Sequence, residues 1–416
     1  GRQGASRRAR QRRALAARLV RRILAAQRAL PETVRRLSWV SFWNDMASEL
    51  LYPVLPLLLT SVLGAPVAAL GIIEGAAEGV AIGLRAVSGW LSDKEGGRRR
   101  RWISAGYALS VLARPLIAVA PAWGVVLGAR LLDRTGKAVR TAPRDALLRE
   151  ATPPGQLGSA FGFHRAMDTA GAVGGPLVAA ILLWQGTPLR WVAAVAVLPG
   201  VVALLITFTV RDIPRTDAER DAVRQGRVRD LPPRFWAVAG AWAFFSLALS
   251  SDAFLVLRAV DLGLSEAWTV LVYAAINVVN VILAWPLGAL SDRIGRRALL
   301  LPGVAIYAVV YLGLALAGGA AAAIPLLLLY GAYGAATDGV ARALVGDAAP
   351  REQSGTAYGA FAALSGVAVL IASVTAGFLW DGISPAAPFW VGGAIAVVSL
   401  PVLWLATRVP GAAASR

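Results

Sequence analysis

The chain contains GWLSDKEGGRRR at residues 89–100 and a related segment, GALSDRIGRRAL, at residues 288–299. A second pair of related segments, PPGQLGSAFG at 153–162 and PREQSGTAYG at 350–359, repeats at nearly the same spacing. Two separate segments that recur at one spacing indicate that the whole fold is duplicated. The sequence therefore predicts two similar halves that run in the same direction and are joined by a linker.

The composition is that of a membrane protein. The 416 residues are 57% hydrophobic and only 16% charged, whereas soluble domains carry about 25% charged residues. A transmembrane helix needs about 20 mostly apolar residues. Twelve such stretches occur, at residues 37–63, 67–91, 102–120, 123–144, 157–184, 188–210, 235–257, 266–290, 298–317, 323–345, 355–380 and 387–407. The sequence predicts an all-α membrane protein with twelve transmembrane helices in two pseudo-symmetric six-helix bundles.

Basic residues predict the orientation, because Lys and Arg in short loops are retained on the cytoplasmic side. Basic clusters follow the second, fourth, sixth and eighth stretches, while the alternate turns at 61–69, 119–124 and 317–325 carry none. We therefore expect both termini on the cytoplasmic side of the inner membrane. The net charge of +18 follows from this asymmetry, so no nucleic-acid partner is expected.

Residues 1–30 are rich in Arg and contain no acid. Three interpretations of this segment stay open: a basic helix on anionic lipid, a targeting segment and a mobile tail. The ends of the predicted transmembrane stretches divide the chain into five expected regions. The regions are a basic cytoplasmic tail at 1–36, an N-terminal bundle at 37–210, a cytoplasmic linker at 211–233, a C-terminal bundle at 234–408 and a tail at 409–416.

The duplicated loop resembles a motif of the major facilitator superfamily of secondary transporters. The second copy matches at Gly288, Leu290, Asp292, Arg293, Gly295, Arg296 and Arg297, and the first at Gly89, Leu91, Asp93, Lys94 and Gly96. An extra glycine, Gly97, leaves open whether Arg98 or Arg99 takes the family's role. The resemblance implies a cytoplasmic gate made of Gly89, Asp93, Lys94, Arg98, Gly288, Asp292, Arg293 and Arg296. Glycine allows helix ends to approach, and Asp with Arg forms strong hydrogen bonds. The alternative is a turn glycine with arginines that only set topology.

The fifth stretch contains FGFHRAMDTAGAVGGPLVAA at residues 161–180. His164, Asp168, Gly171 and Gly175 share one helical face, on which glycine lets a second helix approach closely. The set Gly162, Gly171, Gly175 and Pro176 resembles the fifth-helix motif of exporters that exchange their solute for an opposing ion. Two alanines, Ala179 and Ala180, stand where that motif prefers glycine. The resemblance implies proton-coupled efflux.

A proton-coupled transporter needs a buried group that gains and loses a proton, and acids near bases can do this. The candidates are Asp45, Glu49, Arg130, Asp133, His164 and Asp168, with Glu74 and Glu78 as acids that Arg85 on their own helix can neutralise. We favour Asp45 and Asp168 with Arg130, because the three lie on different helices of the first half. For each residue alone, a salt bridge between helices is the alternative.

Polar residues of predicted transmembrane helices are candidates for the solute path. They are Asn44, Asp252, Asn277, Asn280, Tyr330 and Asp338.

Enzymes and ATP-driven pumps are disfavoured as functional classes. The chain has one histidine, no cysteine, and neither a phosphate-binding Gly-x4-Gly-Lys-Ser/Thr loop nor a metalloprotease motif. We expect a secondary active transporter that exchanges a small solute for protons by alternating access. A proton symporter, a facilitated carrier and a lipid or lysolipid transporter of the same fold are the alternatives. The expected partners are the solute, protons and membrane lipid, with the chain acting as a monomer and using no metal or cofactor.

Overall fold

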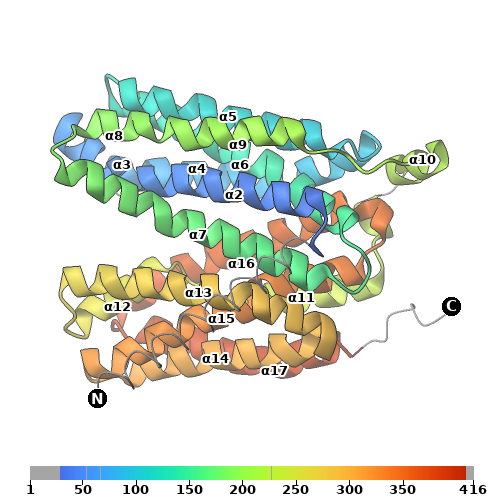
Figure 1. Ribbon diagram of the computed structural model, residues 1–416. Helices are drawn as coiled ribbons and strands as arrows, with labels where there is room; N and C mark the ends of the chain where they lie inside the picture. Colours follow the sequence, from blue (N-terminus) through green and yellow to red (C-terminus); the bar gives the residue numbers. More distant parts are fainter. Residues whose placement is uncertain (1–28, 53, 66, 226, 409–416) are drawn as a thin grey trace, which may run out of the picture.

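The computed structural model describes residues 29–52, 54–65, 67–225 and 227–408. Most of the predicted N-terminal tail and the C-terminal residues 409–416 lie outside the described residues. Within the described part, all regular structure is helical. The N-terminal half, blue to green, and the C-terminal half, yellow to red, form two bundles that lie side by side (Figure 1).

Six helical columns make up the N-terminal half. The first consists of α2 (Glu32–Leu51), α3 (Val54–Leu57) and a π-helical turn (Leu58–Val62), and the sixth of α8 (Leu189–Val195) and α9 (Val197–Thr209). The four continuous columns are α4 (Val67–Lys94), α5 (Arg99–Val119), α6 (Trp123–Ala151) and α7 (Leu157–Trp184). A linker with α10 (Asp217–Gln225) and a 3-10 turn (Val228–Asp230) leads to the second half.

The C-terminal half repeats this pattern of columns. Its first column is broken at residues 247–252 into α11 (Pro233–Ser246) and α12 (Ala253–Asp261). The others are α13 (Glu266–Ile294), α14 (Arg296–Leu316), α15 (Ala320–Ala348), α16 (Ser354–Gly382) and α17 (Ala387–Ala406). A 3-10 turn (Arg351–Gln353) precedes α16. We call the end of the molecule at which α10 lies the linker end (right in Figure 1).

The predicted architecture of twelve transmembrane helices in two six-helix bundles is confirmed. Eight helices among the described residues are long and apolar enough to cross a membrane. The remaining columns include α6, which carries Arg130, Asp133, Arg134 and Lys137 in its middle, and the broken α11–α12 column. Columns of this kind are tolerated in a membrane when they face the interior of a bundle. Helix ends differ from the predicted spans by several residues: α2 begins at Glu32 and α6 extends to Ala151.

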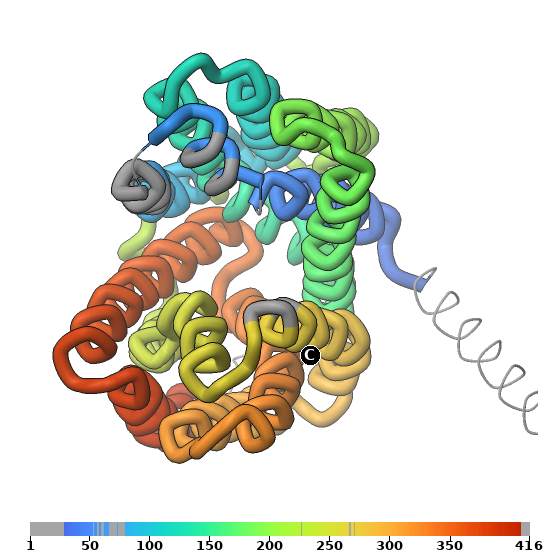
Figure 2. Tube along the Cα trace, turned by 90° about the vertical axis from the view of Figure 1, so that its left-hand side faces the viewer, coloured from blue at the N-terminus to red at the C-terminus, as the bar shows by residue number. Residues whose placement is uncertain are grey.

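The two bundles meet along two equivalent boundaries. Seen from the end opposite the linker, α7 lies against α13 on one side and α4 lies against α16 on the other (Figure 2). At the linker end, a continuous apolar core joins both halves, and the Phe161 and Tyr358 rings meet there with centroids 5.7 Å apart. At each boundary, a helix that leads into one of the duplicated loops (α4 or α13) packs against a helix that begins within the second repeated segment of the other half (α16 or α7).

Candidate functional site

The first repeated loop forms a buried, hydrogen-bonded contact between the two halves, which we call the first latch. Asp93, at the end of α4, accepts hydrogen bonds from the backbone N–H of Gly355 at 3.2 Å and of Thr356 at 2.6 Å. The Thr356 hydroxyl donates to the same carboxylate at 2.6 Å. Gly355 and Thr356 begin α16, so the carboxylate lies at the positive end of that helix dipole.

Arg99 completes the first latch from the start of α5. Its guanidinium donates to Asp93, to the Ser92 hydroxyl at 2.7 Å and to Glu150 at 2.8 Å, and the Arg99 side chain is fully buried. Arg98, the predicted gate residue, is instead exposed, and the neighbouring Arg99 contacts Asp93. Arg99 follows Asp93 by six positions, whereas Arg296 follows Asp292 by four, and Arg99 is the arginine of this loop that contacts Asp93.

The second repeated loop makes the equivalent contact in the opposite direction, the second latch. Asp292, at the end of α13, accepts the backbone N–H of Gly158 at 2.9 Å and of Ser159 at 2.7 Å, at the start of α7. Arg296 donates to Asp292 and, through Nε, to Asp347 at 2.9 Å. Each half therefore places an aspartate on the N-terminus of a helix in the other half.

Glycine is required at these boundaries because the backbones approach closely. A Cβ added to Gly355 would come within 2.6 Å of Arg99 Nη1 and 2.9 Å of Asp93 Oδ1. Gly89 would meet the carbonyl oxygen of Gly355, and Gly288 that of Gly158. The predicted gate glycines thus lie where only a hydrogen fits between two helices.

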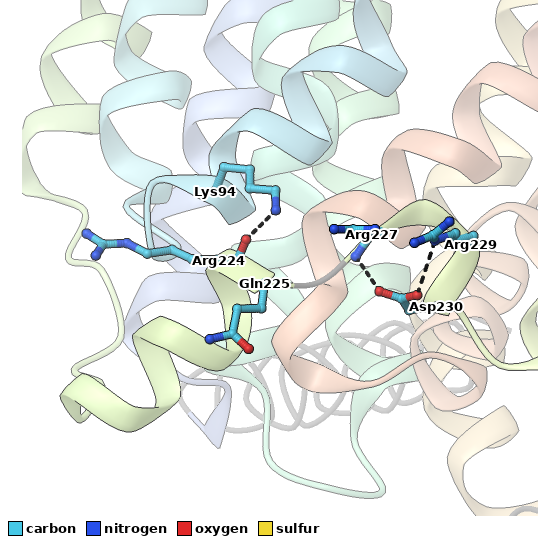
Figure 3. A pocket seen from close by; sticks show the side chains of 6 residues that line it. All are labelled: Lys94, Arg224, Gln225, Arg227, Arg229 and Asp230. Atoms are coloured by element: carbon cyan, nitrogen blue, oxygen red, sulfur yellow. Dashed lines mark hydrogen bonds and ion pairs between the residues drawn. The ribbon is translucent and has the colours of Figure 1, made fainter.

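Other gate candidates lie outside the latches. Lys94 donates to the carbonyl oxygen of Arg224 in the linker and lies 5.7 Å from the Trp90 ring, and Arg293 is exposed. An open cavity of about 500 Å³ lies beside Lys94 (Figure 3). It is lined by Lys94, Arg224, Gln225, Arg227, Arg229 and Asp230. These linker side chains include none of the solute-path candidates.

Further contacts between the halves also lie toward the linker end. Arg149 donates to the carbonyl oxygens of Ala349 and Pro350 at 2.5 and 2.7 Å and to the Ser354 hydroxyl at 2.7 Å. In return, Arg351 donates to the carbonyl oxygen of Thr152 at 3.1 Å. These contacts and the two latches hold the linker end closed.

Two of the favoured coupling residues interact in the middle of the N-terminal half. Asp168 of α7 acts electrostatically on Asp45 of α2, and the Ser41 hydroxyl donates to Asp168. Asn44 Nδ2 donates to Asp45 at 3.3 Å. Two carboxylates that interact in this way repel each other unless they share a proton. We call Asp45 and Asp168 the carboxyl pair.

Arg165 connects the carboxyl pair to the other half. Its Nη1 lies 3.2 Å from Asp168, while its Nε lies 3.0 Å from Asp338 on α15. Both Arg165 and Asp338 keep about 30% of the side chain exposed, at 31% and 29%. An arginine between two acids on different bundles responds to the charge of either acid.

Among the described residues, Arg130 contacts Asp133 and not the carboxyl pair, which differs from the predicted coupling set. Its guanidinium lies 3.5 Å from Asp133, one turn along the same helix. Arg130 acts electrostatically on Glu49 instead, as do Arg134 and Lys137 of the same helix α6. The arginine partner of Asp168 is therefore Arg165, which lies on its own helix. The side chains of Glu74 and Glu78 lie outside the part of the chain that the structure describes.

His164 is fully buried one turn from Asp168, toward the linker end. Neither ring nitrogen has a hydrogen-bond partner in the described part of the chain. Arg144, Arg165 and Arg342 act on it electrostatically along with Asp168. A buried imidazole without a partner is unusual, and here it lies between the carboxyl pair and the linker end.

The glycine face of α7 contacts two different helices. A Cβ on Gly171 would lie 3.0 Å from the backbone nitrogen of Met46, and one on Gly175 would lie 2.5 Å from the carbonyl oxygen of Met46. Gly162 points instead to α13, where its Cβ would lie 2.6 Å from the carbonyl oxygen of Ala284. Pro176 does not end the helix, because α7 continues to Trp184.

The solute-path candidates separate into two groups. Asn44 and Asn280 are buried and hold helices together: Asn44 accepts from Arg114 at 2.9 Å, and Asn280 accepts from Thr169 across the two halves at 3.3 Å. Asp252 is exposed in the break between α11 and α12 and accepts the Tyr330 hydroxyl at 2.8 Å.

Asn277 and Tyr273 lie on α13 near Asp252. Asn277 donates to the carbonyl oxygen of Tyr273 at 3.1 Å, and Tyr273 keeps 39% of its surface exposed. Tyr273 also lies in the electrostatic field of Glu49 and Asp252. Polar groups of the two halves thus face each other on the side of the molecule away from the latches.

Sequence reasoning missed several of these residues. Glu150 and Asp347 occupy equivalent positions in the repeat, a signal that an alignment of the two halves would have revealed. Lys137 was also not among the predicted site residues, although a lysine in the middle of a predicted transmembrane helix is itself a signal. Among the described residues, no group of three or more His, Cys, Asp or Glu side chains is arranged to hold a metal ion.

Solved transporter structures share this fold. The human organic anion transporter MFSD10 superposes with a TM-score of 0.74 at 17% identity, covering 89% of this chain and 98% of that one. The fucose:proton symporter of E. coli gives 0.73 at 14% identity, with 90% and 98% covered. A bacterial homologue of the iron transporter ferroportin, in an outward-facing state, gives 0.72 at 14% identity, with 90% and 99% covered.

Similar sequences extend along most of the chain. An uncharacterised MFS-type transporter of Methanocaldococcus jannaschii is 33% identical over 380 residues, which are 89% of this chain and 94% of that protein. An uncharacterised protein of Mycobacterium tuberculosis is 34% identical over 373 residues, covering 86% and 88%. The family model described as Major Facilitator Superfamily matches residues 37–368. The chain belongs to the major facilitator superfamily of membrane transporters.

Proposed function

We propose that this transporter couples the movement of a small solute to protons at the carboxyl pair of Asp45 and Asp168. The observation that carries the proposal is the position of Arg165, which joins Asp168 to Asp338 of the other half, while Asp168 acts electrostatically on Asp45 of a second helix. A proton bound by the pair weakens the hold of Asp168 on Arg165. The Arg165–Asp338 contact between the bundles then changes, which links protonation to the relative position of the halves.

We further propose that the linker end is cytoplasmic and that the structure is outward-facing. The basic loops and α10 lie at this end, as the positive-inside rule requires. The latches close it, while polar side chains away from it, such as Asp252 and Tyr273, are exposed. In this reading the latches open when the halves rock toward the inward-facing state, and both termini are cytoplasmic.

The first candidate is exchange, in which protons enter the cell while the solute leaves it. The close packing of Gly171 and Gly175 of α7 against α2 supports it, because this glycine spacing resembles the exporter motif. Movement of solute and proton in the same direction is the second candidate. It is supported by an exposed cation, Lys137, close to Asp45, because a proton on Asp45 makes this region more attractive to an anion.

Proteoliposomes that contain a trapped pH dye test the coupling and its direction together. A solute added outside enters down its gradient and acidifies the lumen in co-transport, whereas it makes the lumen alkaline in exchange. We expect Asp45→Asn and Asp168→Asn to abolish the pH signal while solute counterflow persists. Asp217→Asn, at an exposed acid of α10, is the matched control. Proton movement that survives in both carboxyl-pair variants would contradict the proposal.

A further inference from the structure

Lys137 lies at the midpoint of α6 (Trp123–Ala151), and therefore near the middle of the membrane. Its side chain is exposed, while its neighbours Gly136 and Ala138 are buried. The charged groups that act on it are Asp45 of α2, Arg85 of α4, and Arg134 and Arg140 of its own helix. These groups belong to α2 and α4 as well as to α6, so Lys137 lies within the electrostatic influence of charged groups on other helices.

The ammonium group of Lys137 is free of hydrogen bonds and ion pairs within the part of the chain that the structure describes. Other interior cations are engaged: Arg114 donates to Asn44, Arg140 to the Ser110 hydroxyl at 2.6 Å, and Arg165 contacts two acids. Asp45, the acid that acts electrostatically on Lys137, already accepts a hydrogen bond from Asn44. An intramembrane cation without a counter-charge is costly, and such residues usually mark a solute path.

Lysine is also rare in this chain. Lys94 in the cytoplasmic loop and Lys137 are its only lysines, and arginine provides every other side-chain cation apart from histidine. Arginine binds in a fixed planar fork, whereas lysine presents a compact charge on a flexible stem with three donors. A flexible single charge suits a solute group that must be both bound and released.

We infer that Lys137 binds an anionic group of the transported solute, a carboxylate or a phosphate. The inference rests on the proposed proton-coupled transport and names the chemical class of its solute. Glu49 and Asp45 keep this region from binding anions strongly until a proton neutralises one of them. The anion and the proton therefore favour each other's binding, which agrees with co-transport.

The presence of two lysines allows a direct test on the wild-type protein. Purified transporter in lipid nanodiscs is acetylated with a neutral amine-reactive ester, and mass spectrometry of peptides measures the rate at Lys137 and at Lys94 separately. Benzoate and phenyl phosphate serve as anionic probes, with benzamide and benzylamine as their neutral and cationic counterparts. We expect the anions to slow acetylation of Lys137 by about fivefold or more at saturation, with no change at Lys94.

Variants separate binding from a structural role. Lys137→Arg keeps the cation, so we expect benzoate still to stabilise this variant against heat. Lys137→Gln removes the cation, so we expect the stabilisation by benzoate to be lost. Because Lys137 holds no ion pair with any residue that the structure describes, Lys137→Gln itself should melt within about 2 °C of the wild type or above it. A fall of about 5 °C or more would assign Lys137 a structural ion pair and overturn the inference.

The other outcomes are also decisive. Equal protection by benzamide, protection of Lys94 as well, absence of protection by either anion, or an unreactive Lys137 would each overturn the inference. The labelling involves no proton movement, so it is independent of the coupling proposal. If the anions protect Lys137 while the pH signal persists in Asp45→Asn and Asp168→Asn, the anion site stands and the coupling proposal fails.

Discussion

The carboxylate of Asp93 accepts the backbone N–H of Thr356 at 2.6 Å, and this bond joins the end of α4 in one half to the start of α16 in the other. The equivalent bond from Ser159 to Asp292, at 2.7 Å, joins α13 to α7. The acids that complete the two latches, Glu150 and Asp347, are also equivalent in the repeat. The closed end of this transporter is thus held by one arrangement used twice, with donor and acceptor halves exchanged.

Neutralising Asp93 should open the linker end. Asp93→Asn keeps one acceptor oxygen but loses the charge that Arg99 and the α16 N-terminus stabilise, so we expect the closed state to lose about 2 kcal/mol, roughly a 30-fold change in population. The chain has no cysteine, so spin labels at Arg98→Cys and Glu352→Cys can report the distance across this end. Asp217→Asn is the control, and an unchanged distance distribution in Asp93→Asn would argue against a latch.

The two arginines of the first loop should differ sharply. Arg99→Lys keeps the charge but cannot reach Asp93, Ser92 and Glu150 together, so we expect a loss of about 2–3 kcal/mol in the free energy of unfolding. Arg98→Lys, at the exposed neighbour, should change it by less than about 0.5 kcal/mol. Thermal unfolding in nanodiscs compares the two. Equal effects would mean that the Arg99 contacts contribute nothing specific.

A methyl group at the helix boundary should also disrupt the first latch. Gly355→Ala places a Cβ between Arg99 and Asp93, and we expect a loss of about 1–3 kcal/mol with a wider linker end. The matched control is Gly240→Ala on α11, where a Cβ meets nothing within 4 Å. That substitution should be neutral or stabilise the protein by up to about 1 kcal/mol. A Gly355→Ala protein as stable as the control would rule out steric contact at this position.

The link between the carboxyl pair and the other half can be measured with a double-mutant cycle. Arg165→Gln, Asp338→Asn and the double variant should show a coupling energy of about 1 kcal/mol, because both side chains are partly exposed. The exposed pair of Arg220 and Asp217 on α10 provides a reference cycle, in which we expect a coupling near zero. Thermal unfolding measures both cycles. Indistinguishable values would remove Arg165 from the proposed link.

The sequence alone determined the class of protein, the twelve transmembrane helices and the duplication. These properties follow from hydropathy along the chain and from repeated segments, and neither depends on how helices pack. It also placed Asp93, Asp292 and the glycines at one end of the molecule, since those residues lie in the repeated loops themselves. The sequence also selected Asp45 and Asp168 as coupling candidates, because few acids occur in the first half's apolar helices, and their role stays a prediction.

Tertiary structure decided which charges meet. Whether Arg98 or Arg99 reaches Asp93 depends on the turn made by the loop, and whether Arg130 or Arg165 reaches Asp168 depends on the rotation and depth of α6 against α7. A hydrophobic pattern leaves these quantities open, because a shift of one residue turns a side chain by about 100° around its helix. The same reason explains Lys137: its position in the chain was visible, but only the packing of α2, α4 and α6 left its side chain exposed and without an ion pair among the described residues.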